Sequence, residues 1–536
     1  MPVLPSAGGT GHLGRRRFLT LSTLGLAASA GACTASAVPA ASSGGASATG
    51  FDVQAAIASR EAQRPVSGRT ARFALTAAPA RIDLGGPVVS SWAYNDTVPG
   101  PLIRANVGDQ LQLTVRNLLP DPTSLHSHGV AMRNDMDGAQ PASADIGATA
   151  EHTYTYTVPH SGTYWAHPHV GIQTDYGLYA PMVFDDPREV AAYDAEWVVV
   201  LDDWSDGTGT NPKRQLADLQ AGRTGMGSPQ PSGQTAAMPG MPGVSTPSAP
   251  STPSGTSGMA GMGIGRSELL GGDAGDVSYP YYLVNGRVPA APQTFAAKPG
   301  QRVRIRFINA AADTAFRVAL AGHTMTVTHT DGYPAVPHEV DALLIGMAER
   351  YDVIVTLSDG VFPLVASAEG KNAVGRGLIR TAAGEVPPAS WLPPQLNGRV
   401  GTAPPLRGDP AVALPPGAPD VELKVTLAGA MMPYRWTING TPYDRTVPLE
   451  TQQGQRVRLV LTNDSDMWHP MHLHGHTFQL VRPDQGQGVR KDTVIVLPRT
   501  TVPVDLIADN PGVWLLHCHN GYHSESGMMT RLQYTR

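Results

Sequence analysis

The chain has 536 residues, a formal net charge of −5, and only 15% charged residues. This length exceeds what one hydrophobic core organises and indicates about three domains, while the weak negative charge argues against a nucleic-acid partner. Glycine and proline are abundant, with 59 and 48 copies, and helical periodicity is scarce. The composition therefore favours an all-β protein built from sandwiches with many turns.

The N-terminal segment is typical of an export signal. Arg15–Arg17 precede a short apolar run, Leu21–Ala32, which predicts export by the twin-arginine (Tat) route to the cell envelope. The run is too short to span a bilayer permanently. A lipobox-like Ala-Gly-Ala triplet then predicts a lipid on Cys33, with removal of Cys33 by cleavage as the alternative. We expect residues 1–33 to be the signal and residues 34–65, rich in Ala, Ser and Gly, to be a flexible tether.

One alternating strand pattern occurs three times along the chain. The copies begin at Gly108, Gly300 and Gly454, and each follows a turn that contains asparagine. Three copies of a pattern with period two predict three homologous sandwich domains. We place these domains at residues 66–190, 191–395 and 396–536.

A Met-rich insertion separates the first two repeats, at about residues 206–272. Its Gly, Ser, Pro and Thr content cannot bury a core, so we predict a mobile surface loop. The loop contains Met226, Met238, Met241, Met259 and Met262. Thioethers are soft ligands that suit Cu(I), and the alternative is a linker with incidental methionines.

The C-terminal segment carries the residues of a copper site. They are His517, Cys518, His519, His523 and Met528. One thiolate, two imidazoles and a weak axial thioether form the blue-copper ligand set, so Cys518 needs a second histidine from elsewhere. His469 has no counterpart in the first repeat and is the candidate. Neighbouring side chains of a strand face opposite ways, so His517 and His519 point to a second metal site.

Four His-x-His pairs occupy matching places in the first and third repeats. The pairs are His126/His128, His167/His169, His472/His474 and His517/His519. The middle repeat has alanine, valine and serine at these places, so it supplies only the scaffold. Eight imidazoles, four from each outer domain, can hold a three-copper cluster where those domains meet.

With these motifs the chain resembles the three-domain multicopper oxidases, a laccase-like family with three cupredoxin-like Greek-key domains. The resemblance covers roughly residues 66–536. Arg133–Gly138 and Gly346–Asp352 make it most similar to the exported copper-resistance members from actinobacteria, including mycobacteria. One departure is Ser127, which stands where the family usually has tryptophan.

The resemblance implies four copper ions. By matching position, the type 2 copper would be held by His126 and His472, the type 3 pair by His128, His167, His169, His474, His517 and His519, and the type 1 copper by His469, Cys518, His523 and Met528. Electrons would pass from Cys518 through His517 and His519 to the cluster, where four electrons and four protons reduce O2 to two waters.

Proton delivery requires an acid close to the cluster. Asp137 matches the family's aspartate beside the first histidine pair. The family's second acid directly follows the type 1 histidine, and this place is Ser524, with Glu525 one residue further on. Asp137 is therefore the predicted relay acid, and the role of Glu525 stays open.

The electron donor is suggested by residues that precede His469. Met467 occupies the place where cuprous oxidases of the family bind substrate copper, while their aspartate is Ser465 here, so Asp464 or Asp466 would substitute. The alternative is an ordinary surface turn. We expect a monomeric oxidase that takes electrons from Cu(I), and also from phenols, uses O2 and serves copper detoxification.

Two other functions compete with this expectation. A laccase-like enzyme would oxidise phenols as its main substrate. A copper-binding or electron-transfer protein without oxidase activity would need one domain and four ligands, so the eight paired histidines weigh against it.

Overall fold

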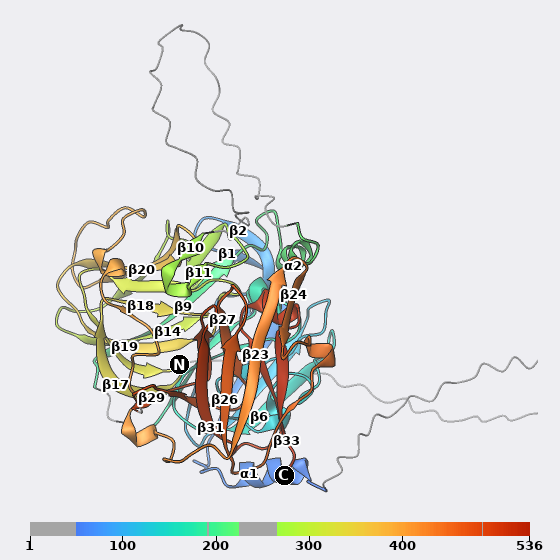
Figure 1. The fold of residues 1–536 in the computed structure, drawn as a ribbon. Helices are drawn as coiled ribbons and strands as arrows, with labels where there is room; N and C mark the ends of the chain where they lie inside the picture. Colours follow the sequence, from blue (N-terminus) through green and yellow to red (C-terminus); the bar gives the residue numbers. More distant parts are fainter. Residues whose placement is uncertain (1–49, 190–191, 224–264, 485) are drawn as a thin grey trace, which may run out of the picture. The chain divides into compact units, whose positions relative to one another are not determined.

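The fold is described from a computed structural model, which defines residues 50–189, 192–223, 265–484 and 486–536 (Figure 1). The predicted signal residues, the lipidation site Cys33 and the five methionines of the insertion lie outside these ranges. Within them, no helix has the length and apolar character needed to cross a membrane.

The first sandwich consists of two four-stranded sheets, with the orders β2-β1-β4-β6 and β3-β8-β7-β5. Its strands are β1 (Thr70–Asp83), β2 (Val88–Tyr94), β3 (Ile103–Asn106), β4 (Gln110–Asn117), β5 (His126–His128), β6 (Glu151–Thr157), β7 (Gly162–His167) and β8 (Ala180–Asp185). Leu111, Leu113 and Val115 alternate along β4 and are fully buried, as expected for a strand with one face on the core.

The second sandwich has two six-stranded sheets, with the orders β12-β9-β14-β19-β16-β17 and β13-β21-β20-β15-β18-β22. The first contains β9 (Ala195–Trp204), β12 (Tyr281–Val284), β14 (Arg302–Asn309), β16 (Met325–Thr330), β17 (Tyr333–Val340) and β19 (Arg350–Thr356). The second contains β13 (Gln293–Ala296), β15 (Phe316–Leu320), β18 (Ala342–Ile345), β20 (Val361–Ala368), β21 (Ala373–Arg380) and β22 (Val400–Gly401).

The third sandwich, orange to red in Figure 1, has a six-stranded sheet β24-β23-β26-β31-β28-β29 and a five-stranded sheet β25-β33-β32-β27-β30. The first contains β23 (Val421–Met431), β24 (Tyr434–Ile438), β26 (Arg456–Asn463), β28 (Phe478–Val481), β29 (Gln487–Lys491) and β31 (Thr501–Ile507). The second contains β25 (Leu449–Thr451), β27 (His469–Leu473), β30 (Thr493–Val496), β32 (Val513–Cys518) and β33 (Met529–Tyr534). The prediction of three β-sandwiches is confirmed.

Each repeated strand ends in a buried asparagine that organises the following turn. Asn117, Asn309 and Asn463 end β4, β14 and β26 and are fully buried. In every copy the side-chain amide donates to main-chain carbonyls, and the side-chain oxygen accepts from the N–H two residues further on. The asparagine thus satisfies backbone groups where the strand leaves its sheet, in the same way three times.

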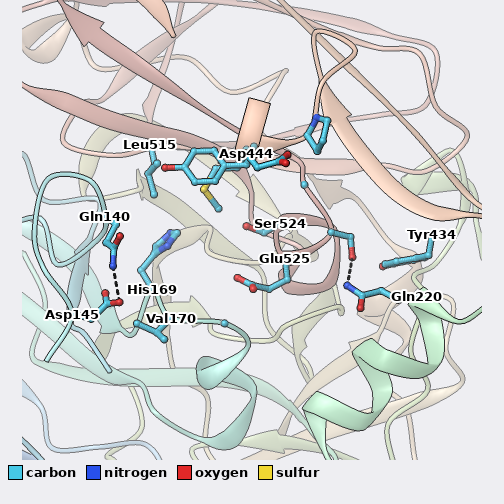
Figure 2. A pocket seen from close by; sticks show the side chains of 16 residues that line it. Gln140, Asp145, His169, Val170, Gln220, Tyr434, Asp444, Leu515, Ser524 and Glu525 are labelled. Carbon is cyan, nitrogen blue, oxygen red and sulfur yellow. Dashed lines mark hydrogen bonds between the residues drawn. The ribbon is translucent and has the colours of Figure 1, made fainter. Parts of the chain in front are cut away.

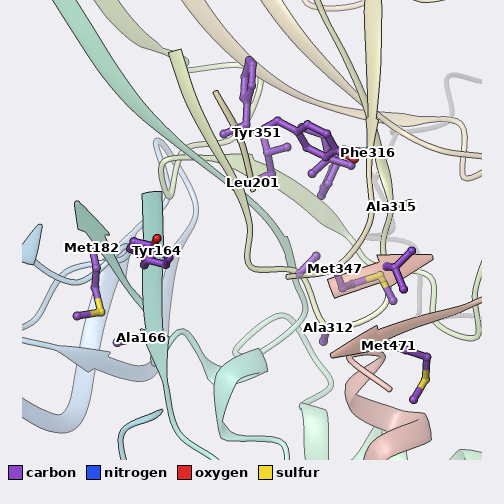
Figure 3. Close-up of a cluster of buried hydrophobic side chains, with 14 of the residues drawn as sticks. Tyr164, Ala166, Met182, Leu201, Ala312, Ala315, Phe316, Met347, Tyr351 and Met471 are labelled. Carbon is purple, nitrogen blue, oxygen red and sulfur yellow. The ribbon is translucent and has the colours of Figure 1, made fainter. Parts of the chain in front are cut away.

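The three sandwiches share one continuous hydrophobic core. Figure 3 shows a part of it, in which Met182 comes from the first sandwich, Phe316 and Met347 from the second, and Met471 from the third. The sites where sandwiches meet are therefore embedded in packed side chains, which hold residues from different domains in fixed positions.

Two predicted loops contain helices instead. The predicted tether includes α1 (Val53–Ala62), which Asp52 caps by accepting from the Ala55 N–H and which buries Ile57. The predicted insertion includes α2 (Pro212–Gln220), capped by Asn211, and a short β10–β11 pair, Arg266–Ser267 with Gly272–Asp273. The flexible-loop prediction was wrong for these segments, because the Gly- and Ser-rich neighbours obscured short capped helices.

Candidate metal centre

Three donor atoms in the third sandwich form a triangle with room for one copper ion at its centre. Cys518 ends β32, His469 begins β27, and His523 lies in the short helix α3 (Gly521–Glu525). The Cys518 Sγ is 3.7 Å from the Nδ1 of each histidine, and the two Nδ1 atoms are 3.1 Å apart. A point equidistant from the three atoms lies about 2.0 Å from each, a normal metal–nitrogen distance.

Hydrogen bonds aim both imidazoles at the sulfur. The outer nitrogen of His469 contacts the Ser465 hydroxyl at 2.8 Å, and that of His523 contacts the Asp276 carboxylate at 2.9 Å. Asp276 belongs to the middle repeat and also accepts from the Tyr434 hydroxyl at 2.6 Å. Outer partners of this kind fix the orientation of metal-binding histidines.

Met528, the fourth residue of the predicted type 1 set, lies beside Cys518 and His523. Met528 is fully buried, its carbonyl accepts from the Cys518 N–H, and its N–H donates to the His523 carbonyl. Burial raises the pKa of the Cys518 thiol, so a metal ion must displace the proton to generate the thiolate. The axial role of Met528 stays a prediction.

The eight paired histidines converge where the first and third sandwiches meet. The His126 and His472 rings lie 5.9 Å apart between centroids, and His126 stacks on His474 at 3.8 Å. The Nε2 atoms of His169 and His474 lie 3.3 and 3.2 Å from that of His517. Residues separated by more than 300 positions thus contribute to one cluster.

Five further Nε2 atoms of this cluster are buried and have no hydrogen-bond partner. They belong to His126, His128, His167, His472 and His519. Burying such atoms unpaired costs free energy, and a metal ion would satisfy each of them. The donor set therefore fits copper ions held by neutral imidazoles.

Backbone carbonyls set the tautomer of several of these rings. The Nδ1 atoms of His126, His167, His472 and His517 lie 2.8–2.9 Å from the carbonyls of Asp137, Pro168, Asp492 and Cys518. With the proton on Nδ1, each ring presents the Nε2 lone pair to the cluster. Burial also lowers the pKa of His128, His167, His169, His472, His474, His517 and His519, which keeps these ligands neutral.

Asp137 bridges the two outer domains at the cluster. Its carboxylate lies 2.9 Å from the Nδ1 of His474, and its carbonyl contacts the His126 ring. The next residue, Gly138, has φ +74°, and a Cβ there would lie 1.8 Å from the Leu125 carbonyl. Only glycine allows the chain to bring Asp137 this close.

The middle sandwich contributes an ion pair that the sequence analysis missed. Arg350 donates to both carboxylate oxygens of Asp492 at 2.6 Å, and both side chains are fully buried. Arg350 also lies 3.4 Å from the Nδ1 of His128, and the Asp492 carbonyl holds His472. The metal-free domain thus supports the cluster, and the only sequence signal was the family-like segment that contains Arg350.

The two metal sites are linked through adjacent strands. In the pairing of β27 with β32, Met471 lies opposite Cys518 and His472 opposite His517. Along the chain, Cys518 of one site stands between His517 and His519 of the other.

An open groove leads toward the cluster (Figure 2). This outer groove has a volume of about 620 Å³ and is lined by His169, Tyr434, Asp444, Ser524 and Glu525, among others. Glu525 projects into it, and the surrounding protein raises the pKa of its carboxyl by displacing water.

The residues of the predicted Cu(I) site lie in different environments. Met467 is 4% exposed and belongs to the hydrophobic core. Asp466 is exposed and forms an ion pair with Arg499 at 2.7 Å, and Asp464 is exposed with its carbonyl bonded to the same arginine. The carboxylate of Asp466 is therefore already paired with a cation in a solvent-exposed contact.

The fold and the donor sets define an oxidoreductase with one cysteine-containing copper site and one histidine cluster. Multicopper oxidase family models match residues 77–189, 195–383 and 417–536, and the chain belongs to this family. It is therefore an oxidase that uses O2 and four copper ions.

Several known proteins are similar to it. The multicopper oxidase MmcO of Mycobacterium tuberculosis is 52% identical over 534 residues, covering both chains fully. A copper resistance protein A homolog of Pseudomonas syringae pv. tomato is 29% identical, covering 86% of this chain and 92% of that protein.

Solved structures show the same fold. Fet3p, a multicopper oxidase that functions in iron import, superposes with a TM-score of 0.69 at 20% identity, over 87% of this chain and 90% of its own. The laccase from Botrytis aclada gives a TM-score of 0.65 at 24% identity, over 90% of each chain. These structures establish cupredoxin-like domains.

Proposed function

We propose that the oxidase takes its electrons from Cu(I), so that four Cu(I), four protons and one O2 yield four Cu(II) and two waters. The main support is the burial of both type 1 histidines. His469 and His523 are inaccessible to solvent, and Ser465 and Asp276 already occupy their outer nitrogens. No imidazole edge is free to bind a phenol, so a donor must deliver its electron through intervening groups.

The Tyr434–Asp276–His523 chain is the proposed entry route. Tyr434 lines the outer groove and donates to Asp276, which contacts His523. The groove also carries the carboxyl groups of Asp145 and Asp444, and negative charge in a cleft attracts cations. A small cation therefore suits this entrance, and relatives named for copper resistance agree with a role in copper detoxification.

The five methionines of the insertion are proposed to deliver Cu(I). To test both proposals, O2 uptake is measured with Cu(I) and with a phenol, for the parent protein and for a variant with Met226, Met238, Met241, Met259 and Met262 replaced by serine. We expect the Cu(I) rate to fall while the phenol rate is retained. Equal Cu(I) rates would remove the methionines' role, and comparable phenol turnover without added copper would refute Cu(I) as the main substrate.

A phenol oxidase is the second candidate. The outer groove is large enough for an aromatic ring, and Tyr434 and Tyr443 form part of its wall. The same O2-uptake comparison separates the two candidates.

Export by the Tat route, a lipid on Cys33 and a monomeric state complete the proposal. Replacing Arg15 and Arg16 by lysine should retain the protein in the cytoplasm, and Cys33→Ala should move it from the membrane to the soluble fraction. Size-exclusion chromatography with light scattering tests the monomer.

A further inference from the structure

A small cavity lies beside the type 3 histidines and continues into the outer groove. This inner cavity has a volume of about 50 Å³ and is lined by His167, His169 and His519, together with the carboxyl groups of Asp175 and Glu525. His169, Ser524 and Glu525 line both the cavity and the groove. The volume has room for one or two water molecules, so water can connect the groove with the cluster.

Asp175 is a buried acid with one free oxygen. It lies in the 3-10 turn Gln173–Tyr176 and is 3% exposed. Its Oδ2 accepts hydrogen bonds from the hydroxyls of Tyr522 at 2.7 Å and Tyr279 at 3.3 Å. Its Oδ1 is buried without any hydrogen-bond partner.

Burial and the two hydroxyl donors favour a proton on the free oxygen. Burial, reinforced chiefly by the nearby carboxyl of Asp203, raises the pKa of Asp175 well above its ordinary value, because an ionised carboxylate with a bare oxygen is costly to bury. Both hydroxyl donors occupy Oδ2. A neutral acid would therefore carry its proton on Oδ1, the oxygen that lacks a hydrogen-bond partner.

We propose that Asp175 is a proton-relay residue for the reduction of O2. Its Oδ1–H passes a proton to water in the inner cavity beside His167, His169 and His519, and a proton returns to Asp175 through water from the outer groove. Each turnover consumes four protons and four electrons per O2, and Asp175 ends the cycle protonated again.

This role differs from that of Asp137. Asp137 contacts His126 and His474, whereas Asp175 lines the cavity on the side of the other type 3 ligands. The inference depends on O2 reduction and not on the identity of the electron donor, so it can fail or succeed independently of the Cu(I) proposal.

The test uses Asp175→Asn in the full-length, copper-loaded protein, with Asp202→Asn as the control. Asparagine keeps an oxygen for the two tyrosines but cannot supply a proton. Asp202 is also buried and bonded to a tyrosine hydroxyl, but the inner cavity is lined by other residues. Each protein is reduced anaerobically and then mixed with O2, while the return of the blue absorbance is followed in H2O and in D2O.

We expect Asp175→Asn to retain four copper ions per chain and the parent's anaerobic rate of reduction. Its reoxidation should slow by about a hundredfold, the lower end of what a positioned acid contributes, with a larger solvent isotope effect. Asp202→Asn should reoxidise at the parent's rate.

Two outcomes would overturn the proposal. One is reoxidation of Asp175→Asn at the parent's rate. The other is a purely structural defect, recognised by loss of copper from Asp175→Asn.

Discussion

The buried contact between Arg350 and Asp492 allows the role of the copper-free domain to be tested. Arg350→Met keeps most of the side-chain volume but removes the only cation that bonds Asp492 among the described residues. Both partners are fully buried and the contact is bidentate, so the lost pair leaves the buried carboxylate without a cation and with the Thr493 hydroxyl as a donor at 2.9 Å. Removing one partner of such a pair costs about 3–5 kcal/mol, and we expect this loss in the free energy of unfolding.

The same change should weaken the histidine cluster but spare the cysteine site. Asp492 positions His472 through its carbonyl, and Arg350 lies against His128, whereas the Cys518 sulfur contacts His469 and His523. We expect the blue absorbance to persist while copper falls below four ions per chain. Denaturant unfolding of the metal-free protein and metal analysis of the loaded protein measure the two effects.

Arg304→Met is the matched control. Arg304 contacts the buried carboxylate of Asp352 at 2.5 Å, but Arg306 stays 3.1 Å from that carboxylate. The control should therefore lose less stability and no copper. The reasoning fails if Arg350→Met unfolds at the parent's denaturant concentration, or if it loses the blue absorbance together with the other copper.

The other predictions concern single sites. Cys518→Ser should lose the blue absorbance and all turnover while keeping most of the cluster copper, and simultaneous loss of all copper would contradict the separation of the sites. Asp276→Asn removes a negative charge from His523 and should raise the type 1 potential by roughly 60 mV, equivalent to a tenfold change for a one-electron couple; a redox titration that shows no shift would argue against it. The pKa of Asp352 is lowered to about 2, first of all by Arg304 and Arg306 against the opposing effect of burial. Its contribution to stability should therefore be complete above about pH 4 and disappear as the pH falls toward 2, which unfolding measurements at several acidic pH values can check.

The copper ligands could be predicted because they form a pattern that repeats. In both outer repeats the first His-x-His pair follows the repeated strand at the same offset and the second pair follows a matching glycine, and cysteine is nearly absent elsewhere, so Cys518 is conspicuous. Residue type and spacing carry this information without any knowledge of the three-dimensional contacts.

The supporting residues could not be predicted in this way. Asp276 contacts His523 across 247 positions, and Arg350 contacts Asp492 across 142. Aspartate and arginine are common residues whose role depends on their neighbours in space. Asp175 is a further example, because nothing in its local sequence shows that one oxygen remains unpaired.

The five unpaired imidazole nitrogens at the interface between the first and third sandwiches have a consequence for how the protein matures. Without copper, this interface buries polar atoms that water would otherwise satisfy. Metal binding and close packing of the first sandwich against the third are therefore thermodynamically linked. Copper supply thus determines how stably the outer domains associate. In a copper-starved cell the protein would open more often at this interface, and proteases would cut it more readily.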